Sequence, residues 1–378
     1  MSINLKILGE KIAYRREELG ESCSELGVAL GIEAARLIGI EEGSIEPTGD
    51  EILILSDHFR CDYKLFLTDE PQGDKPPIQV LYRAKQGEFS KQDRRAIRDF
   101  IYLCETESEL SKDLGRHIAP AALSPRGLRD AEAIAAAEIM RAKLSYSAKD
   151  FTRDVFNDCR RLGIHIFRRR LGDSNISGLF IVHPVAGKCI LINASEDVYR
   201  QRFSAAHELA HALFDADALG LVSLRSEVST PLERRANTFA SAYLMPPAQL
   251  RQLPDPRQWS DEMARHWASQ FRVSCDALGV ALLRSRIINR AESGKIRAVK
   301  VFAADKIDSE IPASLTVSQR IKKTALLEEG LSDFYVALCF DAHRQGLISA
   351  GRLAEALLRS PSELNEVAAL YGHKLYAA

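Results

Sequence analysis

The chain has 378 residues, a formal net charge of −1 and a hydrophobic content of 46%. This composition is typical of a globular protein with two or three domains, and it excludes a uniformly basic protein that binds nucleic acid. Seven single cysteines without a Cys-x-x-Cys pair favour a reducing compartment. A charged amino terminus and the lack of a long apolar run indicate neither a signal peptide nor a membrane span. We therefore expect a cytoplasmic protein with no membrane partner.

Residues 5 to 67 are predicted to form short helices, because apolar residues recur at helical spacing and glycines interrupt the pattern. The string LGEKIAYRREELGESCSELGVALGIEAARLIGIEEGSIEP resembles the helix-turn-helix of lambda-repressor-like (XRE) regulators. The resemblance implies a turn at Gly31 and a recognition helix over residues 33–41. It predicts a helix-turn-helix domain over residues 1–69.

The charge of this domain bears on its partner. Residues 1–69 contain seven Lys and Arg against fourteen Asp and Glu, a formal charge of −7. Lys and Arg supply most non-specific affinity for DNA, so DNA binding through residues 1–69 has little electrostatic support. The competing interpretation is a docking or dimerisation domain, which recognises another helix-turn-helix protein or holds the chain in a homodimer.

Four positions are candidates for DNA contact if this domain binds DNA: Ser24, Ala34, Ala35 and Arg36. Of these, Arg36 alone has a side chain suited to reading a guanine. Two basic clusters elsewhere are further candidates, although a solvated face is the simpler interpretation of both: Arg94, Arg95 and Arg98, and Arg168, Arg169 and Arg170.

The rest of the chain alternates between helical and strand patterns. The polar segment 69–77 has three prolines and is predicted to be a linker, and Ser90 followed by Asp93 marks the start of a long helix. Strands are predicted at 164–170, 176–184 and 187–194, the last two as a hairpin. Helices are predicted at 131–144, 151–162, 196–214, around Glu233, 260–271, 276–288 and 332–345, with further capped helices beginning after Ser349 and Ser360.

The run His207-Glu208-Leu209-Ala210-His211 carries the strongest chemical signal. On a helix this spacing places two imidazoles on one face, and a second helix can bring Glu233 to them. Two His and one Glu around an open position are typical of a catalytic zinc, although Mn²⁺ or Fe²⁺ also fit this set. The carboxylate of Glu208 is then placed to act as the general base on a metal-bound water.

Other residues are assigned supporting roles. Asn237 lies four residues after Glu233 on the same helix face and is predicted to hold a ligand in place. His183 and Tyr243 are candidate donors to an oxyanion, although a structural role is the simpler interpretation of both.

Two strings resemble the ImmA/IrrE family of metallopeptidases: RFSAAHELAHALF (202–214) and ERRANTFASAYLMPP (233–247). The family pairs an A-H-E-x-x-H helix with an E-x-x-A-N-x-F-A helix that ends in Leu-Met-Pro. The resemblance covers about residues 130–250. It implies a zincin-like fold, zinc ligands at His207, His211 and Glu233, and a catalytic Glu208. It also implies that repressor partners are cut or inactivated, in stress response or mobile-element control.

We therefore predict a mostly helical α+β protein in four parts. These are the helix-turn-helix domain (1–69), a linker and connecting helix (70–125), a zincin-like metallopeptidase domain with a small β-sheet (126–290) and a helical C-terminal domain (291–378). The predicted function is a cytoplasmic zinc endopeptidase that cleaves a helix-turn-helix repressor. The alternative is a DNA-binding regulator whose peptidase-like domain senses a metal or ligand without catalysis. The C-terminal domain is expected to regulate access to the active site.

Overall fold

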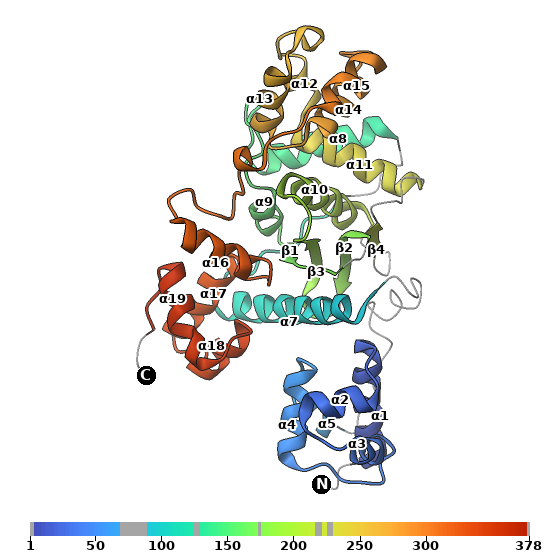
Figure 1. Cartoon of the computed structure of the whole chain (residues 1–378), viewed down its shortest axis with the longest axis vertical. Coiled ribbons are helices and arrows are strands. Elements are labelled where there is room, and N and C mark those ends of the chain that lie inside the picture. Colours follow the sequence, from blue (N-terminus) through green and yellow to red (C-terminus); the bar gives the residue numbers. More distant parts are fainter. Residues whose placement is uncertain are drawn as a thin grey trace. The chain divides into compact units, whose positions relative to one another are not determined.

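The computed structural model describes residues 4–68, 89–123, 129–172, 175–215, 221–224 and 230–375 (Figure 1). The chain divides into two compact units, one of residues 1–105 with 171–174 and the other of residues 106–170 with 175–378. The predicted linker at 69–77 lies outside the described residues. Among the described helices, none has both the length and the apolar character that crossing a membrane requires.

The first unit is a group of short helices. They are α1 (Leu5–Leu19), α2 (Cys23–Leu30), α3 (Ala34–Glu41), α4 (Gly49–His58), α5 (Lys64–Leu67) and the first part of α7 (Lys91–Asp113). Capping boxes at Ser22 and Thr48 begin α2 and α4. Gly27 allows α2 to approach the next turn, since a Cβ there would lie 2.5 Å from the carbonyl oxygen of Ile32. The helix predicted over residues 33–41 is confirmed as α3, with Glu33 at its N-cap, and its role in recognition stays a prediction.

The second unit contains a four-stranded sheet with the order β1-β3-β2-β4. Its strands are β1 (His165–Arg169), β2 (Ile176–His183), β3 (Gly187–Asn193) and β4 (Leu221–Leu224). β1 runs parallel to β3, and the other neighbours are antiparallel. The hairpin turns at Gly187, whose φ of 78° lies in the left-handed region that favours glycine. The three predicted strands are confirmed, and β4 was not predicted.

The second unit has further helices before its C-terminal ones. They are α8 (Asp130–Lys143), α9 (Val155–Arg161), α10 (Val198–Phe214), α11 (Pro231–Leu244), α12 (Pro247–Leu250), α13 (Asp261–Phe271), α14 (Cys275–Arg284) and α15 (Arg290–Ala298), with α8 and α9 preceding β1 in the chain. Of these helices, α9 and α10 contact the strands. α10 packs on β2 and β3, and α11 packs on α10 and α8, so α10 lies between the sheet and these two helices (Figure 1). The helix predicted at 151–162 begins only at Val155, because Asp154 caps it. The helix predicted at 276–288 ends at Arg284, before the left-handed residue Arg286.

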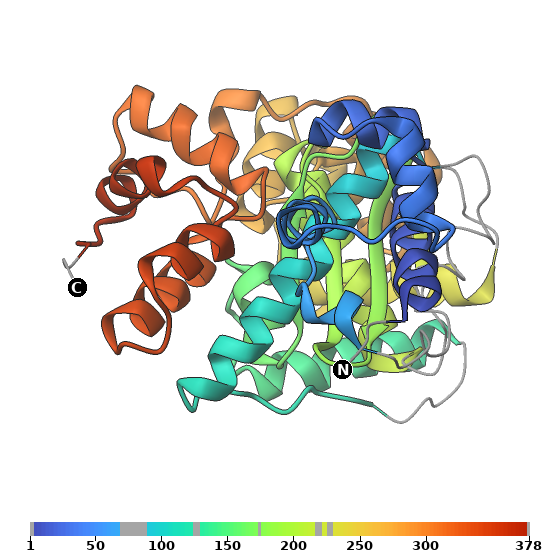
Figure 2. The same cartoon turned by 90° about the horizontal axis from the view of Figure 1, so that it is seen from below.

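The C-terminal helices are α16 (Val317–Leu327), α17 (Asp333–Arg344), α18 (Ala350–Ala356) and α19 (Leu364–Tyr371). They gather beyond the β1 edge of the sheet, on the same side in both views (Figures 1 and 2). An antiparallel bridge joins Arg169 to Glu329, and the amide of Arg170 donates to the carbonyl of Glu328. The segment therefore closes the β1 edge. That it regulates access to the active site stays a prediction.

A buried ion network holds the start of this segment. Arg168 on β1 donates to both carboxylate oxygens of Asp308, at 2.9 and 2.6 Å, and to Glu310 at 3.3 Å. Arg160 on α9 donates to the other oxygen of Glu310 at 2.7 Å. The interpretation of residues 168–170 as a solvated face is wrong for Arg168, which is 5% exposed. These acids already engage its guanidinium, so it has no role in contacting DNA.

Candidate metal centre

Three predicted ligand side chains converge in the second unit. The Nε2 atoms of His207 and His211 lie 3.2 Å apart on α10. A carboxylate oxygen of Glu233 lies 3.0 Å from the first and the other oxygen lies 3.3 Å from the second. All three donor atoms lie within 4.8 Å of one another, and all three residues are buried. The arrangement places two imidazole nitrogens and a carboxylate around one point.

Local sequence explains why Glu233 reaches α10. Thr230 accepts a hydrogen bond from the Glu233 amide and caps α11, with Pro231 at the first helical position. Glu233 thus lies in the first turn, where the helix dipole favours a negative charge. Ala236 and Ala240 are buried on α11 and are small enough to let α10 and α11 approach closely.

The other ring nitrogens fix the tautomers of the two histidines. His207 Nδ1 lies 3.2 Å from the amide oxygen of Asn237, and His211 Nδ1 lies 2.8 Å from a carboxylate oxygen of Asp215. Both oxygens only accept, so each Nδ1 carries a proton, which leaves Nε2 as the nitrogen that would bind a metal ion when the ring is neutral. Two imidazole lone pairs and a carboxylate are a donor set that fits a zinc ion.

Asp215 was missed by the sequence reasoning, although it follows His211 by four residues and so shares its helix face. Its other carboxylate oxygen forms an ion pair with Arg235 of α11. The Arg235 guanidinium also lies over the ring of Phe214, 4.7 Å from its centroid. Burial opposes ionisation of Asp215, but hydrogen bonds from His211 and Arg235 outweigh it and lower the pKa of this carboxyl. Asp215 and Arg235 therefore tie together the two helices that carry the cluster.

The electrostatics of the cluster favour positive charge at its centre. Burial disfavours a charged His211 ring, but hydrogen bonds to Asp215 and Glu233 outweigh it and raise its pKa to about 9. Burial also opposes a charged Glu233, and the two imidazoles outweigh it and lower its pKa to about 2. A divalent cation placed between these side chains would meet the same stabilising field.

Glu208 follows His207 on α10 and is 0% exposed. Its side chain lies against β2 at Gly178. The charge of this carboxylate contributes to the raised pKa of His211, after burial and the two hydrogen bonds. The structure thus brings Glu208 close to the cluster without making it one of the three converging donors.

The two candidate oxyanion donors have other partners. The Tyr243 hydroxyl donates to Asp158 at 2.8 Å, and burial followed by the charge of Asp158 raises its pKa well above the ordinary value. His183 Nδ1 accepts from the amides of Val185 and Ala186 in the hairpin turn. The structure brings neither side chain to the cluster.

In the first unit, the candidate DNA-contacting residues lie on α2 and α3. Ser24 and Ala35 are exposed and Ala34 is half-buried. Arg36 donates to both carboxylate oxygens of Glu51 on α4, at 2.5 and 2.9 Å. This contact, outweighing burial, lowers the pKa of Glu51 to about 2. The guanidinium that could read a base is therefore already paired with an acid.

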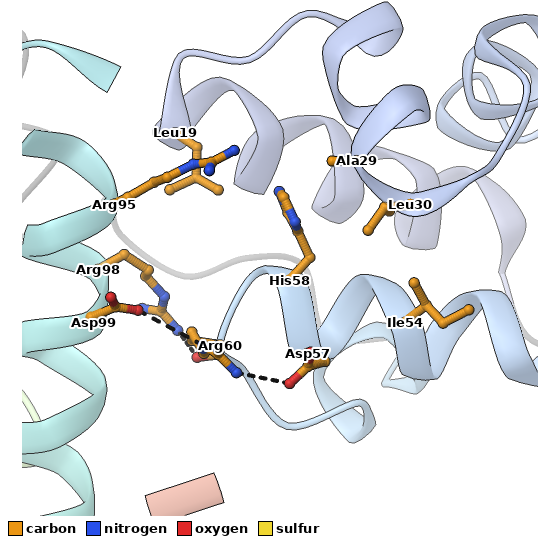
Figure 3. Close-up of a pocket in the computed structure, with 10 residues that line it drawn as sticks. All are labelled: Leu19, Ala29, Leu30, Ile54, Asp57, His58, Arg60, Arg95, Arg98 and Asp99. Atoms are coloured by element: carbon orange, nitrogen blue, oxygen red, sulfur yellow. Dashed lines mark hydrogen bonds and ion pairs between the residues drawn. The ribbon is translucent and has the colours of Figure 1, made fainter. Parts of the chain in front are cut away.

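A groove of about 440 Å³ lies within the first unit and is lined in part by Leu19, Leu30 and Ile54 (Figure 3). The charged side chains that line it pair with one another or with other groups of this unit. Arg95 pairs with Glu21, Arg60 lies 2.8 Å from Asp57 and 3.7 Å from Asp99, and Arg98 donates to the carbonyl of Phe59. The interpretation of residues 94–98 as a solvated face is wrong for Arg98, which is 7% exposed.

Comparison with known proteins agrees with this geometry. Residues 159–283 match the family model described as the IrrE N-terminal-like domain, Peptidase_M78. The chain is also 30% identical over 103 residues to the HTH-type transcriptional regulator DicA of Escherichia coli (strain K12), covering 27% of this chain and 73% of DicA. The chain therefore belongs to the XRE family through its helix-turn-helix domain, which it joins to a metallopeptidase-like domain of the ImmA/IrrE type. This peptidase family implies a divalent metal ion.

Proposed function

We propose that this protein is a cytoplasmic zinc-dependent endopeptidase that cleaves a specific transcriptional regulator of the helix-turn-helix class. One observation carries the proposal: His207, His211 and Glu233 direct their donor atoms at one point, with the Glu208 carboxylate buried nearby. We assign the docking role to residues 1–69, catalysis to residues 126–290 and a regulatory role to residues 291–378.

In this mechanism His207, His211 and Glu233 would hold a zinc ion, which would act as a Lewis acid on the scissile carbonyl and lower the pKa of a water molecule. Glu208 accepts a proton from the attacking water at a carboxylate oxygen and returns it to the leaving amine. Asn237 and Asp215 keep both imidazole rings oriented, with their Nε2 lone pairs directed inward.

The charge of the first domain supports a protein substrate. Residues 1–69 have a formal charge of −7, and Arg36 is engaged by Glu51. Phosphates would gain little from such a surface, whereas the basic DNA-binding face of a repressor would be complementary to it. The first domain then recruits the substrate and the second cuts it.

A second candidate function is a DNA-binding regulator whose peptidase-like domain senses a metal or ligand without catalysis. The similarity to DicA, which is named as a transcriptional regulator, favours this alternative. The two functions differ in whether the Glu208 carboxylate is needed.

The test incubates zinc-loaded protein with helix-turn-helix repressors encoded beside its gene and follows fragments by mass spectrometry. Glu208→Gln is expected to reduce cleavage by about 10²–10⁴-fold, because general base catalysis is lost. Glu262→Gln, which changes an exposed acid on α13, serves as the matched control. Identical fragment yields from wild type and Glu208→Gln would refute catalysis. Operator binding that persists in Glu208→Gln, with no cleavage of any repressor, would favour the regulator.

A further inference from the structure

The Glu208 carboxylate lies in a space that only glycine leaves open. A Cβ atom built on Gly178 of β2 would lie 2.6 Å from Glu208 Oε1, 2.9 Å from its Cγ and 3.1 Å from its Cδ. Carbon atoms in favourable contact stay about 3.5–4.0 Å apart, so any larger residue would overlap the Glu208 side chain. Gly178 is not among the residues with a left-handed backbone. The lack of room for a Cβ atom beside Glu208, rather than the backbone conformation, explains why a glycine occupies position 178.

The strand cannot retreat from this contact. Gly178 pairs with Ile192 on β3, and the pairing of β2 with β4 shifts register between Ile176 and Gly178. The side-chain amide of buried Asn193 also donates to the Ile176 carbonyl at 2.9 Å. Because Gly178 pairs with Ile192 on β3 and with Ser223 on β4, its backbone is held by a strand on each side.

The helix is held equally firmly. Leu209 and Ala212 are 0% exposed in the core next to Glu208. Arg202, earlier on α10, donates to the backbone carbonyls of Arg272, Arg153 and Thr152. With both backbones fixed, a methyl group at position 178 would have to displace the Glu208 side chain itself.

We propose that Gly178 is a positioning residue that sets where the Glu208 carboxylate lies. The missing Cβ lets this side chain lie against β2, one residue along α10 from the ligand His207. The catalytic consequence rests on the proposed function, in which Glu208 is the base, whereas the steric coupling of residues 178 and 208 does not.

The test is a double-mutant cycle on the full chain, with metal removed by a chelator and thermal unfolding followed by circular dichroism. Gly178→Ala is expected to lower Tm by roughly 3–10 °C when Glu208 is present. Most of this drop should vanish in a Glu208→Ala background, because truncation removes the atoms that the new methyl group would meet. Gly294→Ala on α15, where a Cβ would meet nothing within 4 Å, should show no such dependence on Glu208.

Each result decides the proposal. An equal drop in both backgrounds, or no drop in either, overturns it. If Gly178→Ala fails to fold but the Gly178→Ala, Glu208→Ala double variant folds, the proposal is supported. If neither protein folds, the proposal is contradicted, because the methyl group then meets something other than Glu208.

A second readout separates this inference from the proposed function. The zinc content of Gly178→Ala should stay at the wild-type value, because the metal ligands are intact. The kcat for cleavage should fall at least tenfold with KM unchanged, because the displaced Glu208 carboxylate acts in the chemical step. Wild-type kcat in Gly178→Ala would overturn the positioning role. If wild type cuts no repressor, the proposed function fails, and the Tm coupling still tests the placement of Glu208.

Discussion

The helix-turn-helix region and the candidate metal centre differ in whether their charged groups already have partners. On α3 of the first unit, Arg36 meets Glu51 in a short bidentate ion pair, and the acids outnumber the bases. On α10 and α11, His207, His211 and Glu233 direct three donor atoms at one point. A charge that already has a partner offers little to a ligand, whereas converging lone pairs favour a cation. This contrast supports the proposal that the second region carries the chemistry and the first recognises a protein.

The largest expected effect concerns the buried ion network. Arg168→Met would remove the guanidinium that pairs with Asp308 and one of the two that pair with Glu310, at an expected cost of about 3–5 kcal/mol in the free energy of unfolding. Denaturant unfolding measures this cost. Lys322→Met, which removes an exposed pair with Glu366, is the control and should cost less than about 1 kcal/mol. Equal losses in the two variants would contradict this account of the network.

The next effect depends on pH. His165 on β1 lies 2.6 Å from Glu107 of α7. Burial disfavours the charged ring, but Glu107 outweighs it and raises the pKa of His165 from 6.5 to about 9. A raised pKa stabilises the fold fully below pH 6.5, and the contribution is lost as pH rises through about 9.

Between pH 6 and pH 9.5, wild type should therefore lose roughly 2–3 kcal/mol of unfolding free energy that His165→Gln does not lose. Urea unfolding at both values measures the difference. The same pH dependence in both proteins would show that this pair contributes nothing.

A smaller effect is expected at the cluster's edge. Asp215→Asn keeps the shape of the side chain but weakens its hold on the His211 proton and on Arg235. We expect a 10–100-fold loss of zinc affinity, measured by competition with a fluorescent chelator. Asp261→Asn, on the exposed first turn of α13, is the control. Unchanged affinity in Asp215→Asn would mean that the carboxylate does not orient the ring.

The smallest effect is expected in the first unit. Arg36→Ala should change the affinity for DNA less than twofold, because the guanidinium is already paired with Glu51. It should hardly change the free energy of unfolding, because solvent screens an exposed ion pair. Fluorescence anisotropy with labelled duplex at low salt measures the affinity. A tenfold or larger loss would restore Arg36 as a DNA-reading residue and weaken the contrast between the two regions.

Local patterns in the sequence were sufficient for most elements. The strand-like runs on either side of Gly187 predicted the hairpin, and Ser349 caps α18 as expected. β4 was missed because a four-residue strand carries too little periodicity to be recognised. Arg168 was misread because its partners Asp308 and Glu310 lie about 140 residues further along the chain.

Some residues of the candidate site could also be predicted from the sequence, and others could not. The sequence grouped His207, His211 and Glu233 by spacing and by resemblance, and helix spacing would also have indicated Asp215. The role of Gly178 could not be predicted from the sequence, because only the packing of α10 on β2 shows which residue contacts Glu208. Spacing predicts neighbours on one element, and contacts between elements need the fold.

The central claim is that Glu233 completes a zinc site with the two histidines of α10. Metal analysis by inductively coupled plasma mass spectrometry of wild type, Glu233→Ala and the exposed control Glu262→Ala tests it most directly. The account predicts about one zinc per chain in wild type and in the control, and almost none in Glu233→Ala. Equal zinc content in all three proteins would contradict it.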